Sequence, residues 1–314
     1  MGSSETGIPE SKSAPVDPEQ FGVSFSVKQC RRFNSDPTKT LNWLLNEAGF
    51  RRVRLMSYWD EHEKVQGTFD FTTLDEQLDQ VEKAGGVVTL CLGARQPRWP
   101  EFHWPDWAWN ASKDERTKAL LKYVEVVVER YKDRKVIVSW QLENEALLTG
   151  FGERIEIDRP RLREEFALVK KLDTSPRPVI MSTSAAWGIP IIGPIPDMSA
   201  FSYYLIRWKD TKYTTTYHAA FIHRIRAVII RLLWRIPSFI HELQMEPWGP
   251  KDIWEMTPEQ QDQSMGPAQI HKNFAAGRKT NLYPLDLWGG EWWYWRLTTL
   301  NDPTTWDAVR KELS

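Results

Sequence analysis

Cysteine is scarce in this chain, and several patterns that would indicate a particular chemistry are missing. The 314 residues include only Cys30 and Cys91, too few for a disulfide framework or a cysteine-based zinc site, and we expect both to be buried thiols. No Gly-x-Ser-x-Gly stretch supports serine hydrolase chemistry. The histidines His62, His103 and His241 lack an i, i+4 spacing with a third ligand, so we expect neither a metal nor a cofactor.

An excess of charge of one sign is also missing. The chain has 41 Lys and Arg against 42 Asp and Glu, interspersed, for a net charge of −1. This balance gives no electrostatic reason for nucleic-acid binding and suits a neutral substrate better. Residues 1–20 are polar and rich in Pro and Ser, without the apolar run of a signal peptide, so we expect a disordered tail or linker there. A cellular location does not follow from these features.

Tryptophan, in contrast, is abundant, with 17 residues. Trp43 and Trp140 fall inside regular patterns, and we expect them to anchor the core. The Trp-Pro-rich stretch 98–109 falls where a loop is expected, so we expect its rings to line a surface cleft.

Short apolar runs alternate with helical patterns after residue 20, which is typical of βα units around a parallel sheet. Eight strands are predicted, over 21–26, 52–58, 86–92, 136–142, 178–182, 198–204, 238–242 and 285–288. Seven helices are predicted, over 38–48, 72–84, 114–132, 160–171, 216–235, 257–278 and 303–313. This order predicts a single α/β domain over residues 21–314, a (β/α)8 TIM barrel.

Two features of the pattern bear on this fold. Residues 185–196 carry too much Pro and Gly for an ordinary helix, so the fifth helix is expected to be short or missing. The competing fold is a doubly wound open sheet, which normally has a Gly-rich phosphate turn after its first strand. Residues 27–32 stand at that position and contain no glycine.

Glutamates stand at or just after several predicted strand ends. Glu143 and Glu145 end the fourth strand, Glu242 ends the seventh, and Glu291 follows the eighth. A barrel enzyme has its active site at the carboxyl ends of its strands. Breaking a glycosidic bond needs one carboxylic acid and a second carboxylate, and aromatic faces hold sugar rings, so this set of residues suggests sugar chemistry.

The fourth-strand sequence Trp-Gln-Leu-Glu-Asn-Glu, residues 140–145, resembles the Asn-Glu signature of the clan A retaining glycoside hydrolases, which include the family 5 cellulases and mannanases. The resemblance covers nearly the whole chain from residue 21. It implies that Glu145 is the general acid/base and that Glu242, ending the seventh strand, is the nucleophile. Asn144, beside the acid, is suited to hydrogen-bond the sugar 2-hydroxyl.

Further positions stand where this clan places functional groups. The resemblance implies that Arg54 and Tyr204 hydrogen-bond the nucleophile and that Trp288 forms the floor of the sugar site. The second-strand end 58–63 and the third-strand loop 93–101 resemble loops that build sugar subsites. The supporting residues implied by these loops and their neighbours are Trp59, Arg95, Trp99, Trp248 and Glu291.

Three assignments stay open at this stage. Strand alternation puts Glu143 and Glu145 on one face, and the neighbouring Asn144 favours Glu145 as the acid. Glu246 has a Glu-Pro-Trp context that suits a loop contact. Glu291 is a candidate sugar ligand and a rival to Glu242 as nucleophile.

The sequence therefore predicts retaining hydrolysis of a β-linked glycoside, with a carbohydrate substrate, no nucleic-acid partner and a monomeric state. The alternatives are a transglycosylase using the same site and a non-catalytic carbohydrate-binding barrel. Residues 217–237 are basic and apolar without an acidic residue. This segment either packs as a barrel helix or rests on an anionic membrane surface. A membrane anchor preceding the given chain is the other possible route to a membrane.

Overall fold

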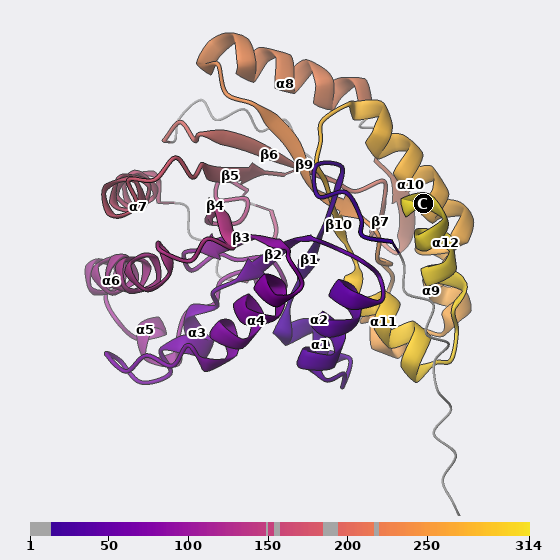
Figure 1. The fold of residues 1–314 in the computed structure, drawn as a ribbon, viewed down its shortest axis with the longest axis horizontal. Helices are drawn as coiled ribbons and strands as arrows, with labels where there is room; N and C mark the ends of the chain where they lie inside the picture. The colour runs from indigo at the N-terminus through magenta and orange to yellow at the C-terminus, as the bar shows by residue number, and fades with distance from the viewer. Residues whose placement is uncertain (1–13, 149, 154–157, 185–193, 217–219) are drawn as a thin grey trace, which may run out of the picture.

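Eight parallel strands form the centre of the molecule and close into a barrel (Figure 1). The structure, a computed structural model, describes residues 14–148, 150–153, 158–184, 194–216 and 220–314. Around the barrel in chain order lie β1 (Phe21–Phe25), β2 (Arg52–Met56), β3 (Val87–Leu92), β4 (Ile137–Leu142), β5 (Val179–Thr183), β6 (Met198–Tyr203), β9 (Ser238–Gln244) and β10 (Leu285–Trp288). The eight predicted strands and the TIM barrel are confirmed, and the open doubly wound sheet is wrong.

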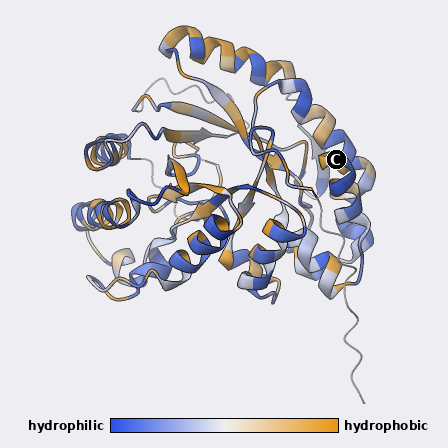
Figure 2. Ribbon diagram, in the orientation of Figure 1, coloured by the Kyte–Doolittle hydropathy of each residue, from blue (hydrophilic) through white to orange (hydrophobic). Residues whose placement is uncertain are grey.

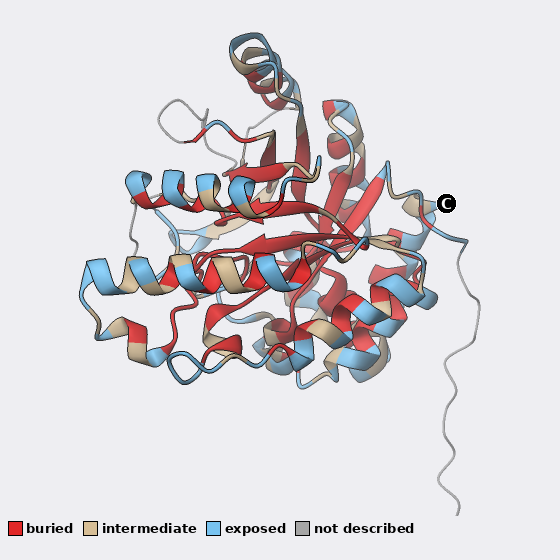
Figure 3. Ribbon diagram, turned by 60° about the vertical axis from the view of Figure 1, so that its left-hand side comes forward, coloured by how far each residue is buried: buried red, intermediate tan, exposed pale blue. Residues whose placement is uncertain are grey.

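The strands are buried along almost their whole length, as expected for a parallel sheet covered by helices on its outer side (Figure 3). The register of neighbouring strands decides which side chains meet at the barrel mouth. Ser202 of β6 pairs with Glu242 of β9, and Arg54 of β2 pairs with Thr89 of β3.

Helices surround the barrel, with α6 and α7 together on one side and α10 and α12 on another (Figure 1). The long helices are α2 (Pro37–Asn46), α4 (Thr72–Lys83), α6 (Lys113–Tyr131), α7 (Arg159–Leu172), α8 (Ala220–Trp234), α9 (Pro258–Met265), α10 (Pro267–Thr280), α11 (Gly290–Thr299) and α12 (Thr304–Leu313). Short helical turns are α1 (Val27–Arg32), α3 (Trp59–His62), α5 (Asp106–Trp109) and η1 (Ile253–Glu255). None of the helices in the described part of the chain is long and apolar enough to cross a membrane.

Local sequence explains several helix boundaries. Ser112 and Glu115 form a reciprocal capping box at the start of α6, and Thr257 and Gln260 form another at the start of α9. The prediction of one helix over 257–278 is wrong, because the chain turns to an extended conformation at Gly266 and α10 starts afresh at Pro267.

Some elements were not predicted. These are α1, α3, α5, η1, α11 and a two-stranded hairpin of β7 (Ile206–Lys209) and β8 (Lys212–Thr215). The residues expected to contain a short or missing fifth helix lie mostly outside the described residues. Ser184 and residues 194–197, which are described, form no helix.

Residues 14–20 are the described part of the predicted tail. Val16 is buried, and its N–H donates to the carbonyl of Gly49 at 2.9 Å. Gly49 has φ +85°, and a Cβ there would lie 2.6 Å from the carbonyl oxygen of Ala14. Val16 therefore packs on the barrel, the rest of residues 14–20 are exposed or half-buried, and residues 1–13 lie outside the described residues.

Aromatic rings are part of the core between barrel and helices, and Figure 2 shows hydrophobic residues on the barrel strands. Trp43 and Trp140 are buried, as predicted for core anchors, and so are both cysteines. The expectation for the stretch 98–109 is wrong in part. Trp104 is buried, and Trp104 and Trp107 pack against the fully buried Trp59 with ring centroids 5.4 and 5.6 Å away.

Candidate active site

Glu242 lies at the mouth of the barrel, held by two donors. One carboxyl oxygen accepts a hydrogen bond from Nη1 of Arg54 at 2.6 Å, and the other accepts one from the Tyr204 hydroxyl at 3.0 Å. Burial and the negative charge of Glu242 raise the pKa of Tyr204 well above its usual value. The phenol therefore stays protonated and donates, and this set of donors suits an ionised carboxylate.

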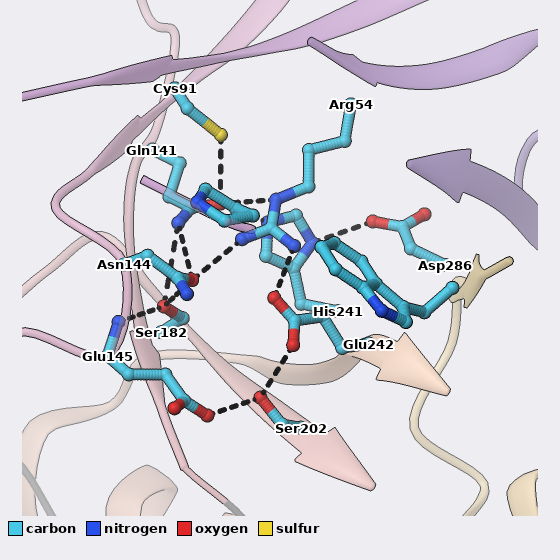
Figure 4. A network of polar contacts seen from close by, with 12 residues as sticks. Arg54, Cys91, Gln141, Asn144, Glu145, Ser182, Ser202, His241, Glu242 and Asp286 are labelled. Carbon is cyan, nitrogen blue, oxygen red and sulfur yellow. Dashed lines mark hydrogen bonds and ion pairs between the residues drawn. The ribbon is translucent and has the colours of Figure 1, made fainter. Parts of the chain in front are cut away.

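A serine hydroxyl connects Glu242 to Glu145. Oγ of Ser202 is 2.6 Å from Oε1 of Glu145 and 3.3 Å from Oε2 of Glu242 (Figure 4). A hydroxyl has one proton and two lone pairs. Its one proton is donated to one carboxyl oxygen at a time, and the shorter of the two contacts is the one to Glu145.

The same two contacts limit the distance between the carboxyl groups. The two acceptor oxygens cannot lie further apart than the sum of the 2.6 Å and 3.3 Å contacts. That limit is below the roughly 6.5 Å at which the carboxyl separation of inverting glycosidases begins. The geometry leaves little room for a water molecule between the acids and suits direct attack by one of them.

Glu145 has the environment of a proton donor. Burial first, and then the negative charge of Glu242, raise its pKa to about 7, against the opposing effect of the Ser202 hydrogen bond. Its backbone N–H donates to Oγ of Ser182 at 2.8 Å, which fixes the residue after the end of β4. Glu145 is thus a carboxyl group that retains its proton up to near-neutral pH.

Arg54 links Glu242 to residues at and just after the end of β4 (Figure 4). Its other guanidinium nitrogens donate to Oδ1 of Asn144 at 2.9 Å and to Oε1 of Gln141 at 2.7 Å. Because one fully buried guanidinium contacts Glu242, Asn144 and Gln141, the residues after β4 and the middle of β9 are fixed relative to each other.

His241 lies below the mouth and is a neutral structural residue. Its ring nitrogens contact Asp286 at 2.7 Å and Gln141 at 2.5 Å. Burial and the nearby charge of Arg54 lower the pKa of His241 to about 4. At neutral pH this ring therefore adds hydrogen bonds without adding positive charge beside Glu242.

Glu101 is a third buried carboxyl group at the mouth. Its Oε2 accepts a hydrogen bond from Nδ2 of Asn144 at 3.2 Å and lies 3.7 Å from Nε of Arg95. Burial, followed by the negative charge of Glu145, raises the pKa of Glu101 to about 8. Glu101 therefore orients the Asn144 amide while remaining largely uncharged at neutral pH.

The structure separates Glu143 from Glu145, which strand alternation could not do. β4 ends at Leu142, and both glutamates have left-handed backbones, with φ +41° and +44°. Glu143 turns to the β3 side, where its carboxylate accepts the N–H groups of Ala94 and Arg95 at 3.1 and 2.6 Å. The expectation that both side chains share one face is wrong, and Glu143 supports the loop after β3.

Glu246 and Glu291 belong to a second charged cluster. Arg98 donates to Glu246 at 2.5 Å and to Glu291 at 2.8 Å, and its guanidinium lies 4.0 Å from the ring centre of Trp288. Trp288 donates its indole N–H to Glu246 at 2.7 Å and is only 5% exposed. In this conformation Arg98 covers the ring that was expected to form the sugar floor. Glu291 also accepts the backbone N–H of Ser26.

A row of aromatic rings leads away from Glu242. The Trp248 ring lies 5.5 Å from that of Tyr204 and stacks on Phe151 at 6.1 Å, and Phe151 meets Trp99 edge-on at 5.7 Å. Trp99 is 44% exposed and Phe151 is 37% exposed. The structure thus brings the predicted Trp99 and Trp248 together at a partly open surface beside the site.

Two residues that were predicted to support sugar binding, Trp59 and Arg95, are buried away from this aromatic surface. Trp59 is fully buried and donates its indole N–H to Glu63 at 2.5 Å, so its ring offers no surface to a substrate. Arg95 is also buried, and it donates to the carbonyls of Leu148 and Phe151 at 2.8 and 2.9 Å. Arg95 therefore shapes the loop after β4 instead of presenting its guanidinium to a ligand.

Several residues of the site were missed from sequence. Ser202 is two positions before Tyr204 in a strand, so alternation puts both on one face and could have indicated it. Arg98, Glu101 and Phe151 lie in irregular loops, where no periodicity indicates direction. Among the described residues, no group of three or more His, Cys, Asp or Glu side chains is arranged to hold a metal ion.

Comparison with known proteins gives a partial match in sequence and a broad match in fold. A family model described as beta-galactosidase, of glycoside hydrolase family 42, matches residues 34–157. The beta-galactosidase BgaH of Haloferax lucentense is 30% identical over a region covering 32% of this chain and 18% of that protein. The chain therefore matches less than a fifth of the length of this curated relative.

Two solved structures show the extent of the likeness in fold. A GH5_18 protein from Streptomyces cattleya, solved in complex with GlcNAc, is 16% identical with a TM-score of 0.58, covering 88% of this chain and 71% of that one. The exo-beta-1,4-mannosidase Op5Man5 from Opitutaceae bacterium strain TAV5 is 15% identical with a TM-score of 0.58. The match covers 90% of this chain and 54% of that one.

These comparisons refine the expected resemblance. The likeness to clan A barrels is confirmed for the fold, while the sequence match is to a family 42 model and not to family 5. The matched residues include Arg54 and Glu145 but stop well before Glu242. For the second half of the site, the support is the geometry described above.

Proposed function

We propose that this chain is a retaining β-glycosidase in which Glu242 is the nucleophile and Glu145 the general acid and base. The observation that carries the proposal is the Ser202 hydroxyl placed between the two carboxyl groups. One of these groups has a guanidinium partner, and the other has a pKa raised to about 7. Two carboxyl groups in different protonation states, close together, are what double displacement requires.

In the first step a Glu242 oxygen attacks the anomeric carbon from the face opposite the leaving group. A carbon–oxygen bond to Glu242 forms as the glycosidic bond breaks, and Glu145 gives its proton to the departing oxygen. Arg54 and Tyr204 hold Glu242 in place for this attack. The free N–H of the Asn144 amide, whose oxygen is fixed by Arg54, is suited to the sugar 2-hydroxyl.

In the second step the ionised Glu145 acts as a base. It takes a proton from water, the water oxygen bonds to the anomeric carbon, and the bond to Glu242 breaks. The two inversions give a product with the β configuration of the substrate. Glu145 regains its proton and Glu242 its charge, so the site returns to its starting state.

The names of the relatives suggest which sugars to test first. The matched curated relative is a beta-galactosidase, and one structural neighbour is an exo-beta-1,4-mannosidase. Galactose and mannose differ from glucose at single hydroxyls, so discrimination depends on polar side chains such as Glu101, Glu246 and Glu291. For a sugar to stack on Trp288, the Arg98 guanidinium must leave the ring face.

The test is chemical rescue. Glu242→Ala is expected to reduce turnover of an aryl β-galactoside or β-mannoside on the order of 10⁴-fold or more. Sodium azide should restore turnover and give the α-glycosyl azide, because azide attacks from the side that Glu242 occupied. With Glu145→Ala, azide should instead give the β-glycosyl azide, since it then replaces water in the second step.

Glu291→Ala is the matched control, because it removes a buried glutamate from the neighbouring cluster. The assignment is wrong if Glu291→Ala, and not Glu242→Ala, is rescued as the α-azide. If the wild-type protein cleaves no β-glycoside in a panel of galactosides, mannosides, glucosides and xylosides but binds an oligosaccharide, the non-catalytic alternative replaces the proposal.

The exposed aromatic row favours transglycosylation as a second activity of the same site. Trp99, Phe151 and Trp248 could hold an acceptor sugar, whose hydroxyl would then take the place of water. Raising the concentration of an oligosaccharide acceptor would then increase the ratio of transfer product to free sugar. Trp99→Ala should lower that ratio more than it lowers hydrolysis of an aryl glycoside.

A further inference from the structure

α8 presents five large apolar side chains to solvent. Within the helix, large apolar side chains with exposed fractions of 46% to 76% follow each other along one side at Phe221, Ile225, Val228, Leu232 and Leu233. Figure 1 places α8 at the outer edge of the molecule, and Figure 2 shows hydrophobic residues recurring along it. We call these five side chains the α8 apolar stripe.

The inner side of the same helix is unusually polar. His223 and Arg226 are buried, and Arg226 donates to Oγ1 of Thr183 at 3.0 Å and stacks on Phe201 at 4.2 Å. Ala227 and Ile230 complete the buried side. α8 therefore does pack on the barrel as a helix, but its five exposed large apolar residues lie outside the packed side. Burial in the barrel does not account for them.

The charge around the stripe is of one sign. Arg224, Arg231 and Arg235 are exposed, and no Asp or Glu occurs between Asp210 and Glu242. The chain as a whole is nearly neutral, so this helix departs from the rest of the protein. An amphipathic helix with exposed large apolar residues beside arginines is typical of interfacial helices that lie on anionic lipid.

We propose that α8 is a binding surface for an anionic phospholipid bilayer. The stripe enters the boundary between headgroups and acyl chains, and the three arginines contact lipid phosphates. A second copy of the chain fits less well, because stacking two copies on this surface would bring six exposed guanidinium groups together, from Arg224, Arg231 and Arg235 of each, without an acidic residue of α8 between them.

The position of α8 leaves the candidate active site accessible. α8 connects β6 to β9, and a helix between two parallel barrel strands runs antiparallel to them along the outer wall. Its exposed side is therefore on the flank of the barrel, while the glutamates are at the carboxyl ends of the strands. Membrane binding and catalysis are separate properties, and either can be lost without the other.

The first test is sedimentation of the full chain with vesicles. Vesicles of phosphatidylcholine with 30% phosphatidylglycerol should bind the wild-type protein at least 10-fold more tightly than pure phosphatidylcholine vesicles. The double variant Leu232→Ser/Leu233→Ser should lose at least 10-fold in affinity for the anionic vesicles. Val65→Ser is the matched control, because Val65 is 66% exposed on another part of the surface and its loss should change nothing.

A second measurement reports insertion directly. Both native cysteines are buried, so a single added thiol can be labelled selectively. An environment-sensitive fluorophore on Val228→Cys should brighten and shift to the blue on anionic vesicles, and the same label on Val65→Cys should not. Absence of wild-type binding to anionic vesicles at low salt would overturn the proposal. Equal binding of the wild type and Leu232→Ser/Leu233→Ser to anionic vesicles would also overturn it, because the arginines alone would then account for binding. A concentration-dependent dimer of the wild type that Leu232→Ser/Leu233→Ser abolishes would overturn it as well.

Discussion

At the scale of single residues, the candidate site depends on neighbours that give two glutamates different electrostatic surroundings. Glu242 faces a guanidinium and a phenol, whereas Glu145 is buried beside the charge of Glu242. Ser202 contacts both, and its hydrogen bond lowers the pKa of Glu145. A change at Ser202 should therefore move a pKa without removing either acid.

Ser202→Ala is expected to shift the alkaline limb of activity to higher pH. The general acid must be protonated, so kcat/KM for a substrate with a poor leaving group falls as pH rises through about 7, the pKa of Glu145. The Ser202 hydroxyl lowers that pKa by donating to the carboxylate, so its loss raises the pKa. A pH profile of kcat/KM for an alkyl β-glycoside measures the shift.

Ser202→Thr is the matched control. It keeps a hydroxyl, so the alkaline limb of its pH profile should stay where it is in the wild type. A limb that stays in place in Ser202→Ala, or that moves to lower pH, would show that the Ser202 contact does not set the protonation of Glu145.

Sequence reasoning was accurate for residues at strand ends and weaker in loops. Arg54 in β2, Glu242 in β9 and Tyr204 just after β6 meet because the parallel strands of the barrel bring these positions to the same end. The directions of Glu143 and Glu145 depend on left-handed backbones that no alternation rule contains. Trp288 is on the expected strand, but Arg98, from a loop distant in sequence, covers its face.

At the scale of elements, the turn between β10 and α11 leaves no room for a side chain at Gly289. Gly289 has φ +155°, and a Cβ there would lie 2.3 Å from the carbonyl oxygen of Met245. Because the obstructing atom belongs to the backbone of the segment after β9, it cannot move without displacing that segment. This turn holds α11, which carries Glu291, against the end of β9.

Gly289→Ala is expected to lower the free energy of unfolding by at least about 3 kcal/mol, from strain and steric overlap together. Urea denaturation followed by circular dichroism measures the change. Gly85→Ala is the matched control, because Gly85 has φ +71° but no atom lies within 4 Å of the place its Cβ would take. Its cost should be about 1–2 kcal/mol, from the left-handed backbone alone. Equal losses in the two variants would contradict the steric argument.

The elements that were not predicted from sequence were missed for physical reasons that differ from one element to the next. Trp292, Trp293, Trp295 and Arg296 of α11 are all buried, so this helix has little of the one-sided pattern that reveals a surface helix. The predicted helix over 257–278 contained its own break, a Gly-Pro step at Gly266. The β7–β8 hairpin is only partly buried, and its strands have four residues each.

At the scale of the whole molecule, the barrel combines two parts of the chain into one site. The part that matches the beta-galactosidase family model contributes Arg54 and Glu145, and the remainder contributes Tyr204 and Glu242. Closure of β1 on both β2 and β10 keeps these parts together. The α8 apolar stripe is on the flank of the same barrel, so one fold carries two separable surfaces.

The central claim is that Glu242 forms a covalent bond to the sugar. The most direct test uses a 2-deoxy-2-fluoro β-glycoside with a dinitrophenyl leaving group, built on the sugar whose aryl glycoside the wild-type protein hydrolyses fastest. The fluorine slows both steps, and the activated leaving group compensates in the first step only, so the glycosyl-enzyme accumulates. We expect the intact mass to rise by one fluoro-sugar, with peptide mapping placing the label on Glu242. A label on Glu291 or any other residue, or a protein that turns over the parent glycoside without ever being labelled, would contradict the account.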